Sequence, residues 1–181
     1  MRKELKNILN KDYWLYGLSE RDFDFTLRLT NDIIKAIKSN YKAIEKKVYA
    51  EKPDSAEDIL DDISYYTYLD TIYVLHFCLW RLQAVFEGIL YFTFIKPFFN
   101  KNLVGLKTKL NKARSIGYKL SDSEFDELLL WGNLRNILSH APPEEFRPIN
   151  LTKKDLLEYK KLILKICKRW FNEKNKLLKV V

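Results

Sequence analysis

The sequence predicts an all-α fold, a helical bundle with two long antiparallel helices and about three shorter ones. Glycine and proline number only five each in 181 residues, which leaves little material for turns. Apolar residues recur at spacings of three, four and seven, as they do on one face of a helix. No segment alternates convincingly with the period of two that is typical of strands, and no hairpin turn motif is present.

Four helix starts share one pattern, in which a hydroxyl residue is followed three positions later by an acid. The hydroxyl can accept a hydrogen bond from an early backbone N–H, and the acid is favoured at the positive end of the helix. Because each pair opens an apolar-periodic run, the four pairs together predict four helix starts. The pairs are Ser19 with Asp22, Ser55 with Asp58, Ser121 with Glu124, and Thr152 with Asp155.

The two long helices are expected in the first half of the chain. The first should run from about residue 19 to residue 49, and a turn at residues 52–54 should follow. The second should run from residue 55 to about residue 95, because Pro97 cannot continue it. Such a length favours a kink, for which Gly88 is the weakest point.

The shorter helices are expected at residues 103–116, 121–140 and 152–174. Gly117 is predicted to stop the first of them, since glycine readily adopts the left-handed conformation of a helix end. A proline-rich loop should separate the other two, with Pro142, Pro143 and Pro148. Residues 19–181 are therefore predicted to form a single domain, with residues 1–18 as an arm docked on the bundle or on a partner.

Several features favour a soluble, cytoplasmic protein without a membrane segment. The N-terminal residues are polar and charged, unlike a signal peptide. The most apolar stretch, residues 71–99, predicts a buried helix because charged and polar residues interrupt it. Cys78 and Cys167 are isolated and predict two free thiols in a reducing compartment. The interrupting residues are His76, Arg81, Gln83, Glu87 and Lys96.

The net charge of +8 is unevenly distributed. Residues 54–70 carry six acids and no base, residues 96–119 carry seven bases and no acid, and residues 151–181 carry ten bases and three acids. The basic segments are either ordinary solvated helix faces or a footprint for a polyanion. Charge alone does not separate RNA from DNA or from an acidic protein.

The helix predicted at 121–140 ends with an unusual group of polar residues. Arg135 can bind phosphate oxygens with two donors, and His140, near a helix C-terminus, can act as a general acid or base. Asn136 lies four residues before His140 and so shares its face of the helix. The alternative is structural: His140 caps the helix, and Arg135 pairs with Glu87 or with an acid on its own helix.

The string Leu134-Arg135-Asn136-Ile137-Leu138-Ser139-His140 resembles the Arg-x4-6-His motif of the HEPN superfamily, including the polar residue directly after the arginine. The helical layout is also similar over roughly residues 55–175, because the motif lies late in a small all-helical chain. A toxin branch of that family has tyrosine two positions after the histidine. This chain has Pro142 there, so regulation by tyrosine modification is not expected.

The resemblance implies a metal-independent endoribonuclease without cofactors, acting as a homodimer in prokaryotic defence, abortive-infection or toxin–antitoxin systems, with an antitoxin or regulator as a further partner. Arg135 would bind the scissile phosphate, His140 would transfer protons and Asn136 would orient them. Glu87 is a candidate supporting partner of Arg135, or else pairs with Arg81 or faces solvent. The alternatives are a non-catalytic HEPN module that dimerises or binds nucleotides or a partner, and an unrelated helical nucleic-acid-binding protein.

Other polar and aromatic residues favour structural roles. His76 is expected at the edge of the core, and the aromatic residues at 91–99 in the core or an interface. The acids at 54–62 lie near a helix start, where acids are common, so no metal site is predicted. No phosphate-binding loop, dinucleotide motif or zinc spacing is present in the sequence.

Overall fold

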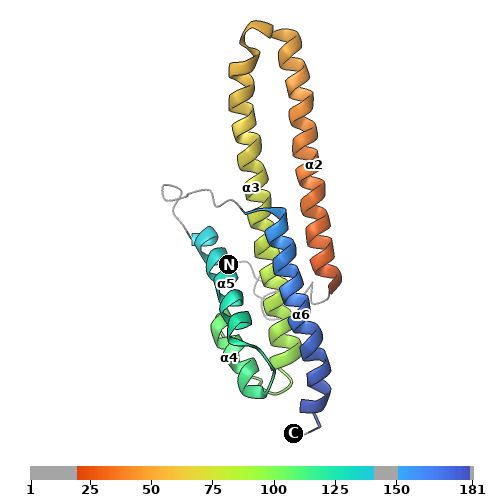
Figure 1. The fold of residues 1–181 in the computed structure, drawn as a ribbon, viewed down its shortest axis with the longest axis vertical. Coiled ribbons are helices and arrows are strands. Elements are labelled where there is room, and N and C mark those ends of the chain that lie inside the picture. The colour runs from red at the N-terminus through yellow and green to blue at the C-terminus, as the bar shows by residue number, and fades with distance from the viewer. Residues whose placement is uncertain (1–19, 141–150, 180–181) are drawn as a thin grey trace, which may run out of the picture.

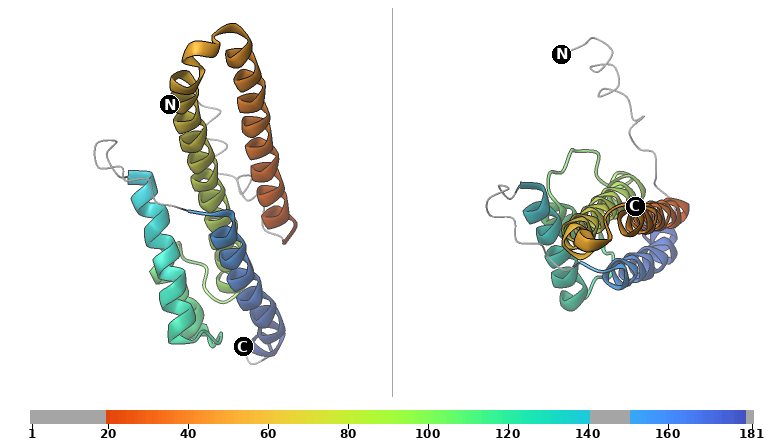
Figure 2. Two further views of the ribbon diagram at one scale, coloured as in Figure 1. Left: turned by 45° about the horizontal axis from the view of Figure 1, so that its top comes forward. Right: turned by 90° about the horizontal axis from the view of Figure 1, so that it is seen from above.

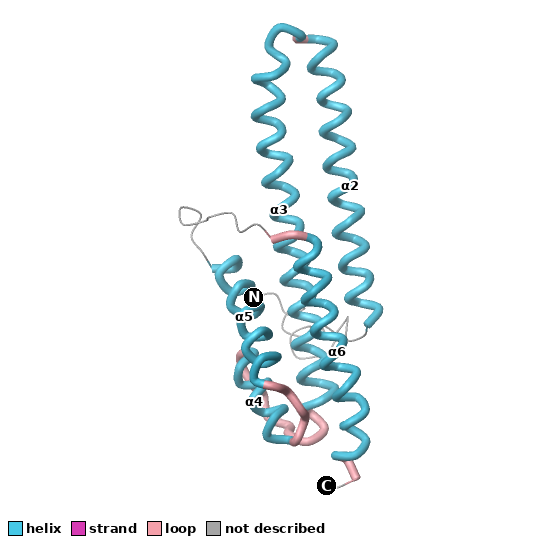
Figure 3. Tube along the Cα trace, in the orientation of Figure 1, coloured by secondary structure: helices cyan, strands magenta, loops and turns pink. Residues whose placement is uncertain are grey.

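The computed structural model describes residues 20–140 and 151–179, without the side chain of residue 140. Five α-helices account for most of this part of the chain, and none of it forms a strand (Figure 3). The predicted all-α class is therefore confirmed. The predicted arm at 1–18 and the proline-rich loop at 142–148 lie outside the described residues.

Helices α2 (Glu20–Glu51) and α3 (Ala56–Gly88) form an antiparallel hairpin that extends well beyond the other helices (Figure 1). A short 3-10 turn, η2 (Pro53–Ser55), joins them. The prediction that Ser55 caps α3 is wrong, because its side chain makes no capping hydrogen bond. Its backbone, with φ −122° and ψ 15°, already belongs to the turn and lacks the extended conformation of a capping residue.

The core lies where α5 and α6 cover α3, at the end of the hairpin away from its turn (Figures 1 and 2). Helix α2 buries side chains only near its start, and most buried residues of α3 come from Ile72 onward. The hairpin's far end is therefore two helices side by side, with little core of its own. The largest fully buried side chains of the described residues are Trp170, Tyr159, Phe23, Phe86 and Phe94.

Helix α3 leads directly into a π-helix, η3 (Ile89–Ile95), so the helical stretch ends at Ile95 as predicted, while its α-helical part ends at Gly88. The wider turn is shown by the N–H of Lys96, which donates to the carbonyl of Tyr91 five residues earlier at 2.7 Å. The change of helix type follows directly after the glycine that was expected to be the weak point.

The shorter helices begin and end largely through local chemistry. Helix α4 (Leu106–Ile116) ends at Gly117, whose φ of 111° confirms the predicted glycine stop. Helix α5 (Asp122–His140) follows Ser121, which exchanges hydrogen bonds of 3.2 Å with Glu124 in both directions. This reciprocal pair is the capping box that the sequence predicts.

Helix α6 (Lys153–Leu177) starts with a second capping box, between Thr152 and Asp155, as predicted. It continues to Leu177 rather than ending near Lys174, and its buried face packs on α3. Within the described residues, the stretch Pro53–Ile95 is long and apolar enough to cross a membrane, by length and composition only. Its most apolar 18 residues are 56% buried inside the protein. A central helix of a bundle has the same properties, so this stretch does not assign a location.

Candidate functional site

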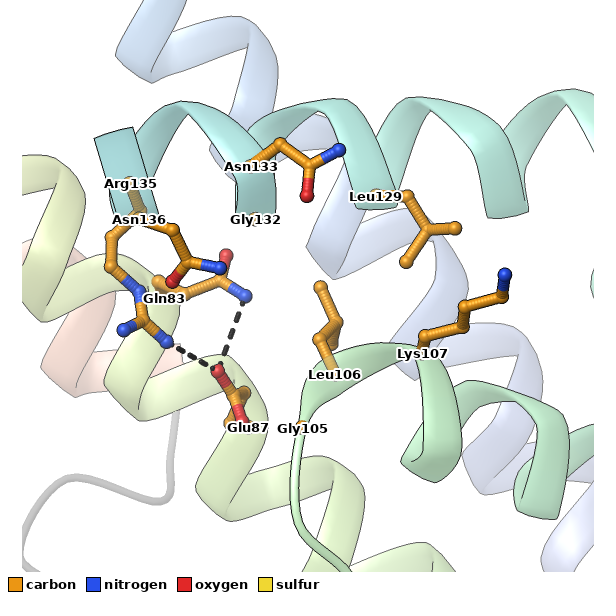
Figure 4. A pocket seen from close by; sticks show the side chains of 10 residues that line it. All are labelled: Gln83, Glu87, Gly105, Leu106, Lys107, Leu129, Gly132, Asn133, Arg135 and Asn136. Carbon is orange, nitrogen blue, oxygen red and sulfur yellow. Dashed lines mark hydrogen bonds and ion pairs between the residues drawn. The ribbon is translucent and has the colours of Figure 1, made fainter. Parts of the chain in front are cut away.

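A pocket of about 600 Å³ opens between α3, α4 and α5 (Figure 4). Three of the four predicted site residues line it, namely Glu87, Arg135 and Asn136. The fourth, His140, is the last residue of α5, and its side chain lies outside the described part of the structure. The other lining residues are Gln83, Gly105, Leu106, Lys107, Leu129, Gly132 and Asn133.

Two glycines allow the walls of this pocket to form. Gly105 has a φ of 82°, which an L-residue rarely adopts, and it turns the chain into α4. Gly132 lies where α5 approaches α4 and α3 closely, because a Cβ there would be 2.9 Å from Leu106 Cδ2 and 3.8 Å from Gln83 Nε2. The missing side chain brings the helix that carries Arg135 next to Gln83.

The carboxylate of Glu87 lies between two cations. Its Oε1 accepts a hydrogen bond from Arg135 Nη2 at 3.0 Å, and its Oε2 accepts one from Lys109 Nζ at 2.5 Å. The side chains of Glu87 and Lys109 are 14% and 16% exposed, whereas that of Arg135 is 33% exposed. Of the alternatives for Glu87, the pair with Arg135 is the one formed, while Arg81 lies on the exposed surface of α3. The cluster keeps one net positive charge, and the guanidinium partly faces the pocket.

A buried polar layer lies behind Glu87. Gln83 Nε2 donates to Glu87 Oε1 at 3.4 Å, and the hydroxyl of Tyr159 donates to Gln83 Oε1. Burial raises the pKa of Tyr159 well above its ordinary value, and the negative charge of Glu87 raises it further. The hydroxyl therefore stays protonated and remains a donor. The ring of Trp131, from α5, stacks on Tyr159 with centroids 4.7 Å apart.

Sequence reasoning gave no role in the site to Gln83, Lys109 or Tyr159. Gln83 has a visible signal, because an amide four residues before Glu87 shares its helix face. Lys109 and Tyr159 have none, since they are 22 and 76 residues from their partners in the sequence.

The remaining predicted residues lie away from the pocket-lining set. His76 is buried in α3 with its ring edge-on to Tyr73, which fits the expected place at the edge of the core. Phe94 is fully buried, 5.4 Å from the rings of both Tyr118 and Trp170, so it belongs to the core. The acids at 54–62 are exposed, and the described residues contain no group of three or more potential metal ligands.

Several bases of α6 form ion pairs with acids of other helices. Lys160 pairs with Asp24 and Lys168 with Glu20, which ties α6 to α2. Arg169 donates two hydrogen bonds to Glu124, at 3.1 and 2.6 Å. These bonds are the main reason why the pKa of Glu124 falls to about 2. Four of the ten bases in residues 151–181 are thus paired with acids of other helices, namely Lys160, Lys165, Lys168 and Arg169.

Comparison with known proteins does not place this chain in a family. No family model, no curated protein and no solved structure matches the sequence or the fold.

Proposed function

We propose that this chain is a metal-independent endoribonuclease of the HEPN type, which cleaves single-stranded RNA at a site shared by two copies of the chain. The main support is that Arg135 reaches an open pocket of about 600 Å³ near the end of the helix whose last residue is His140. Its side chain is one-third exposed and lines the pocket, and the hydrogen bond to Glu87 uses only Nη2 of the guanidinium.

The proposed reaction needs no group beyond these side chains. The ribose 2′-OH attacks the adjacent phosphorus, the bond from phosphorus to the 5′-oxygen breaks, and a 2′,3′-cyclic phosphate is left. Arg135 offsets the charge that grows on the phosphoryl oxygens. His140 accepts the proton of the 2′-OH, the leaving 5′-oxygen receives a proton from an imidazole and departs as a 5′-hydroxyl, and Asn136 orients His140. Acid–base assistance of this kind contributes roughly 10²–10⁴-fold in rate.

A homodimer is part of this proposal, because one chain supplies a single Arg135 and a single His140. The outer face of α5 supports it, since Leu130 is 69% exposed and Ile137 is 57% exposed. Exposed apolar side chains on the helix that carries the motif favour a contact there with another protein surface. An antitoxin or regulator would be a second partner of the same region.

The proposal is tested by incubating the purified protein with single-stranded RNA in EDTA. Wild type should cleave, whereas His140→Ala and Arg135→Ala should lose cleavage. Lys154→Ala is a matched control, because Lys154 lies on the exposed surface of α6 and does not line the pocket. Equal cleavage by His140→Ala, or no cleavage by the wild type, refutes the nuclease proposal.

A second candidate is a non-catalytic HEPN module that dimerises and binds a nucleotide or a partner protein. The observation that favours it is that Glu87 already bonds Arg135, which reduces the positive charge offered to a substrate phosphate. It predicts a dimer that binds nucleoside monophosphates in calorimetry and does not cleave RNA. Arg135→Ala should then abolish the binding.

A further inference from the structure

A continuous chain of hydrogen bonds runs from the core to the pocket. Tyr159 on α6 and Gln83 on α3 are both fully buried. The hydroxyl of Tyr159 donates to Gln83 Oε1, and Gln83 Nε2 donates to Glu87 Oε1 at 3.4 Å. The same carboxylate oxygen accepts the hydrogen bond from Arg135 Nη2 at 3.0 Å. These hydrogen bonds therefore link α6, through α3, to the helix that carries Arg135, and Figure 4 shows the part from Gln83 through Glu87 to Arg135.

These buried polar groups are not needed to fill space. An apolar pair of similar size would occupy the same volume without the cost of burying an amide and a hydroxyl. The two partners of Gln83 are Tyr159 on the core side and Glu87 on the pocket side. What the polar pair adds is a fixed hydrogen bond to the carboxylate of Glu87.

Both carboxylate oxygens of Glu87 are held by hydrogen bonds. Gln83 and Arg135 share Oε1, while Lys109 holds Oε2 at 2.5 Å. Trp131 stacks on the ring of Tyr159 at an interplanar angle of 27°, and Trp131 belongs to the same helix as Arg135. A carboxylate held at both oxygens presents a single position to the guanidinium.

We propose that Gln83 and Tyr159 are positioning residues that act through Glu87 to hold the guanidinium of Arg135 where it meets a phosphate group in the pocket. This inference rests on the proposed function, because it takes an RNA phosphodiester as that group. Tyr159 does not line the pocket, and Gln83, which does, is fully buried, so both would act through Glu87 rather than by contact with the substrate. A displacement of about 1 Å at a group that stabilises the transition state costs up to about 100-fold in rate.

The test uses the full chain with the single variant Tyr159→Phe and the double variant Tyr159→Phe/Gln83→Met. The single variant leaves the carbonyl of Gln83 unpaired in the core, so its urea midpoint should fall. The double variant replaces both partners with apolar groups of similar size, so the midpoint should recover. The kcat for RNA cleavage should stay roughly 10-fold below wild type in both variants, with KM little changed.

Tyr118→Phe is the matched control. Tyr118 is also buried, and its hydroxyl has no hydrogen-bond partner among the described residues. Its ring packs on Phe94 and Trp170, away from the pocket-lining residues. This substitution removes a buried, unpaired hydroxyl without breaking a bond, so the midpoint should not fall and the cleavage rate should match wild type.

A second readout does not depend on cleavage. Nitrogen-15 NMR of the Arg135 guanidinium measures its rotation about the Nε–Cζ bond, which should be slower in the wild type than in the double variant. A recovered midpoint, a lowered kcat and a freer guanidinium support the positioning role. A double variant with wild-type kcat, or with a guanidinium as restricted as in the wild type, overturns it. If the wild type does not cleave RNA, only the nuclease proposal fails. The rotation of the Arg135 guanidinium still decides whether Gln83 and Tyr159 position it.

Discussion

The backbone of Gly132 packs against the side chain of Leu106, at the place where α5 meets the first residue of α4. A Cβ at residue 132 would lie 2.9 Å from Leu106 Cδ2, well inside the separation that two non-bonded carbons prefer. The bare backbone therefore lets α5 approach α4 and Gln83. This approach forms one wall of the pocket that contains Arg135.

Gly132→Ala should lower the free energy of unfolding by about 1 kcal/mol, although the same exchange inside an open helix raises it by a similar amount. Leu106 is only 9% exposed and belongs to the core cluster, so moving its Cδ2 toward the pocket to relieve the clash gives up core packing. In a Leu106→Ala background the clash is absent, and Gly132→Ala should become stabilising. Urea unfolding followed by circular dichroism measures all four proteins. A stabilising effect in the wild-type background would show that the two helices are not in close contact.

Acid should weaken the contact between α5 and α6. The pKa of Glu124 is lowered from 4.5 to about 2, chiefly by its hydrogen bonds from Arg169. Because the folded pKa lies below the unfolded one, the stabilisation is complete above about pH 4.5 and is lost as the pH falls toward 2. Glu124→Gln should therefore cost on the order of 2 kcal/mol at pH 7 and much less at pH 2.5. The difference in unfolding free energy between the two proteins, measured at each pH, tests this; a constant difference contradicts it.

The parts of the fold that the sequence predicts well depend on interactions between residues only a few positions apart in the sequence. The capping boxes at Ser121 and Thr152 each join residues three apart, and Gly117 stops α4 through its own backbone freedom. Ser55 follows the same pattern and fails. The turn that begins at Pro53 sets the backbone conformation of Ser55. The three-residue spacing of hydroxyl and acid does not reveal this conformation.

The site was predictable only in part, for a related reason. Glu87 was expected to need a cationic partner because it interrupts an apolar helix, and Arg135 was one of the alternatives. Which partner Glu87 takes depends on the close packing of α5 on α3, and Gly132 permits that packing. The contributions of Lys109 and Tyr159 came from α4 and α6, and no local pattern in either helix points to Glu87.

Both thiols should be unreactive in the folded protein. Burial raises the pKa of Cys167 to about 12, and it also raises that of Cys78, against the opposing effect of a hydrogen bond with Thr30. Neither residue therefore supplies a thiolate at neutral pH, and both are buried and free. Titration with a thiol-specific chromogenic reagent should detect almost no reaction in buffer and both cysteines in denaturant. Rapid labelling of either residue in buffer would contradict the packing of α3 against α6.

The cluster of Glu87, Arg135 and Lys109 should respond unequally to the loss of its members. When Arg135 is replaced by Gln, Glu87 keeps Lys109 at 2.5 Å, so the loss of stability should stay below about 1 kcal/mol. When Glu87 is replaced by Gln, two cations are left side by side without a counter-charge. The cost should then be about 1–3 kcal/mol.

Inorganic phosphate should reverse most of the loss in Glu87→Gln. An anion that binds only the folded state stabilises it in proportion to the logarithm of its concentration, and here it would supply the negative charge next to Arg135 and Lys109 that Glu87→Gln removes. The melting temperature of Glu87→Gln should therefore rise with phosphate more steeply than that of the wild type. The double variant Glu87→Gln/Arg135→Gln is the control, because it presents only one of the two cations and should respond like the wild type. Equal phosphate responses in Glu87→Gln and the wild type would show that the two cations do not converge on one anion-sized position.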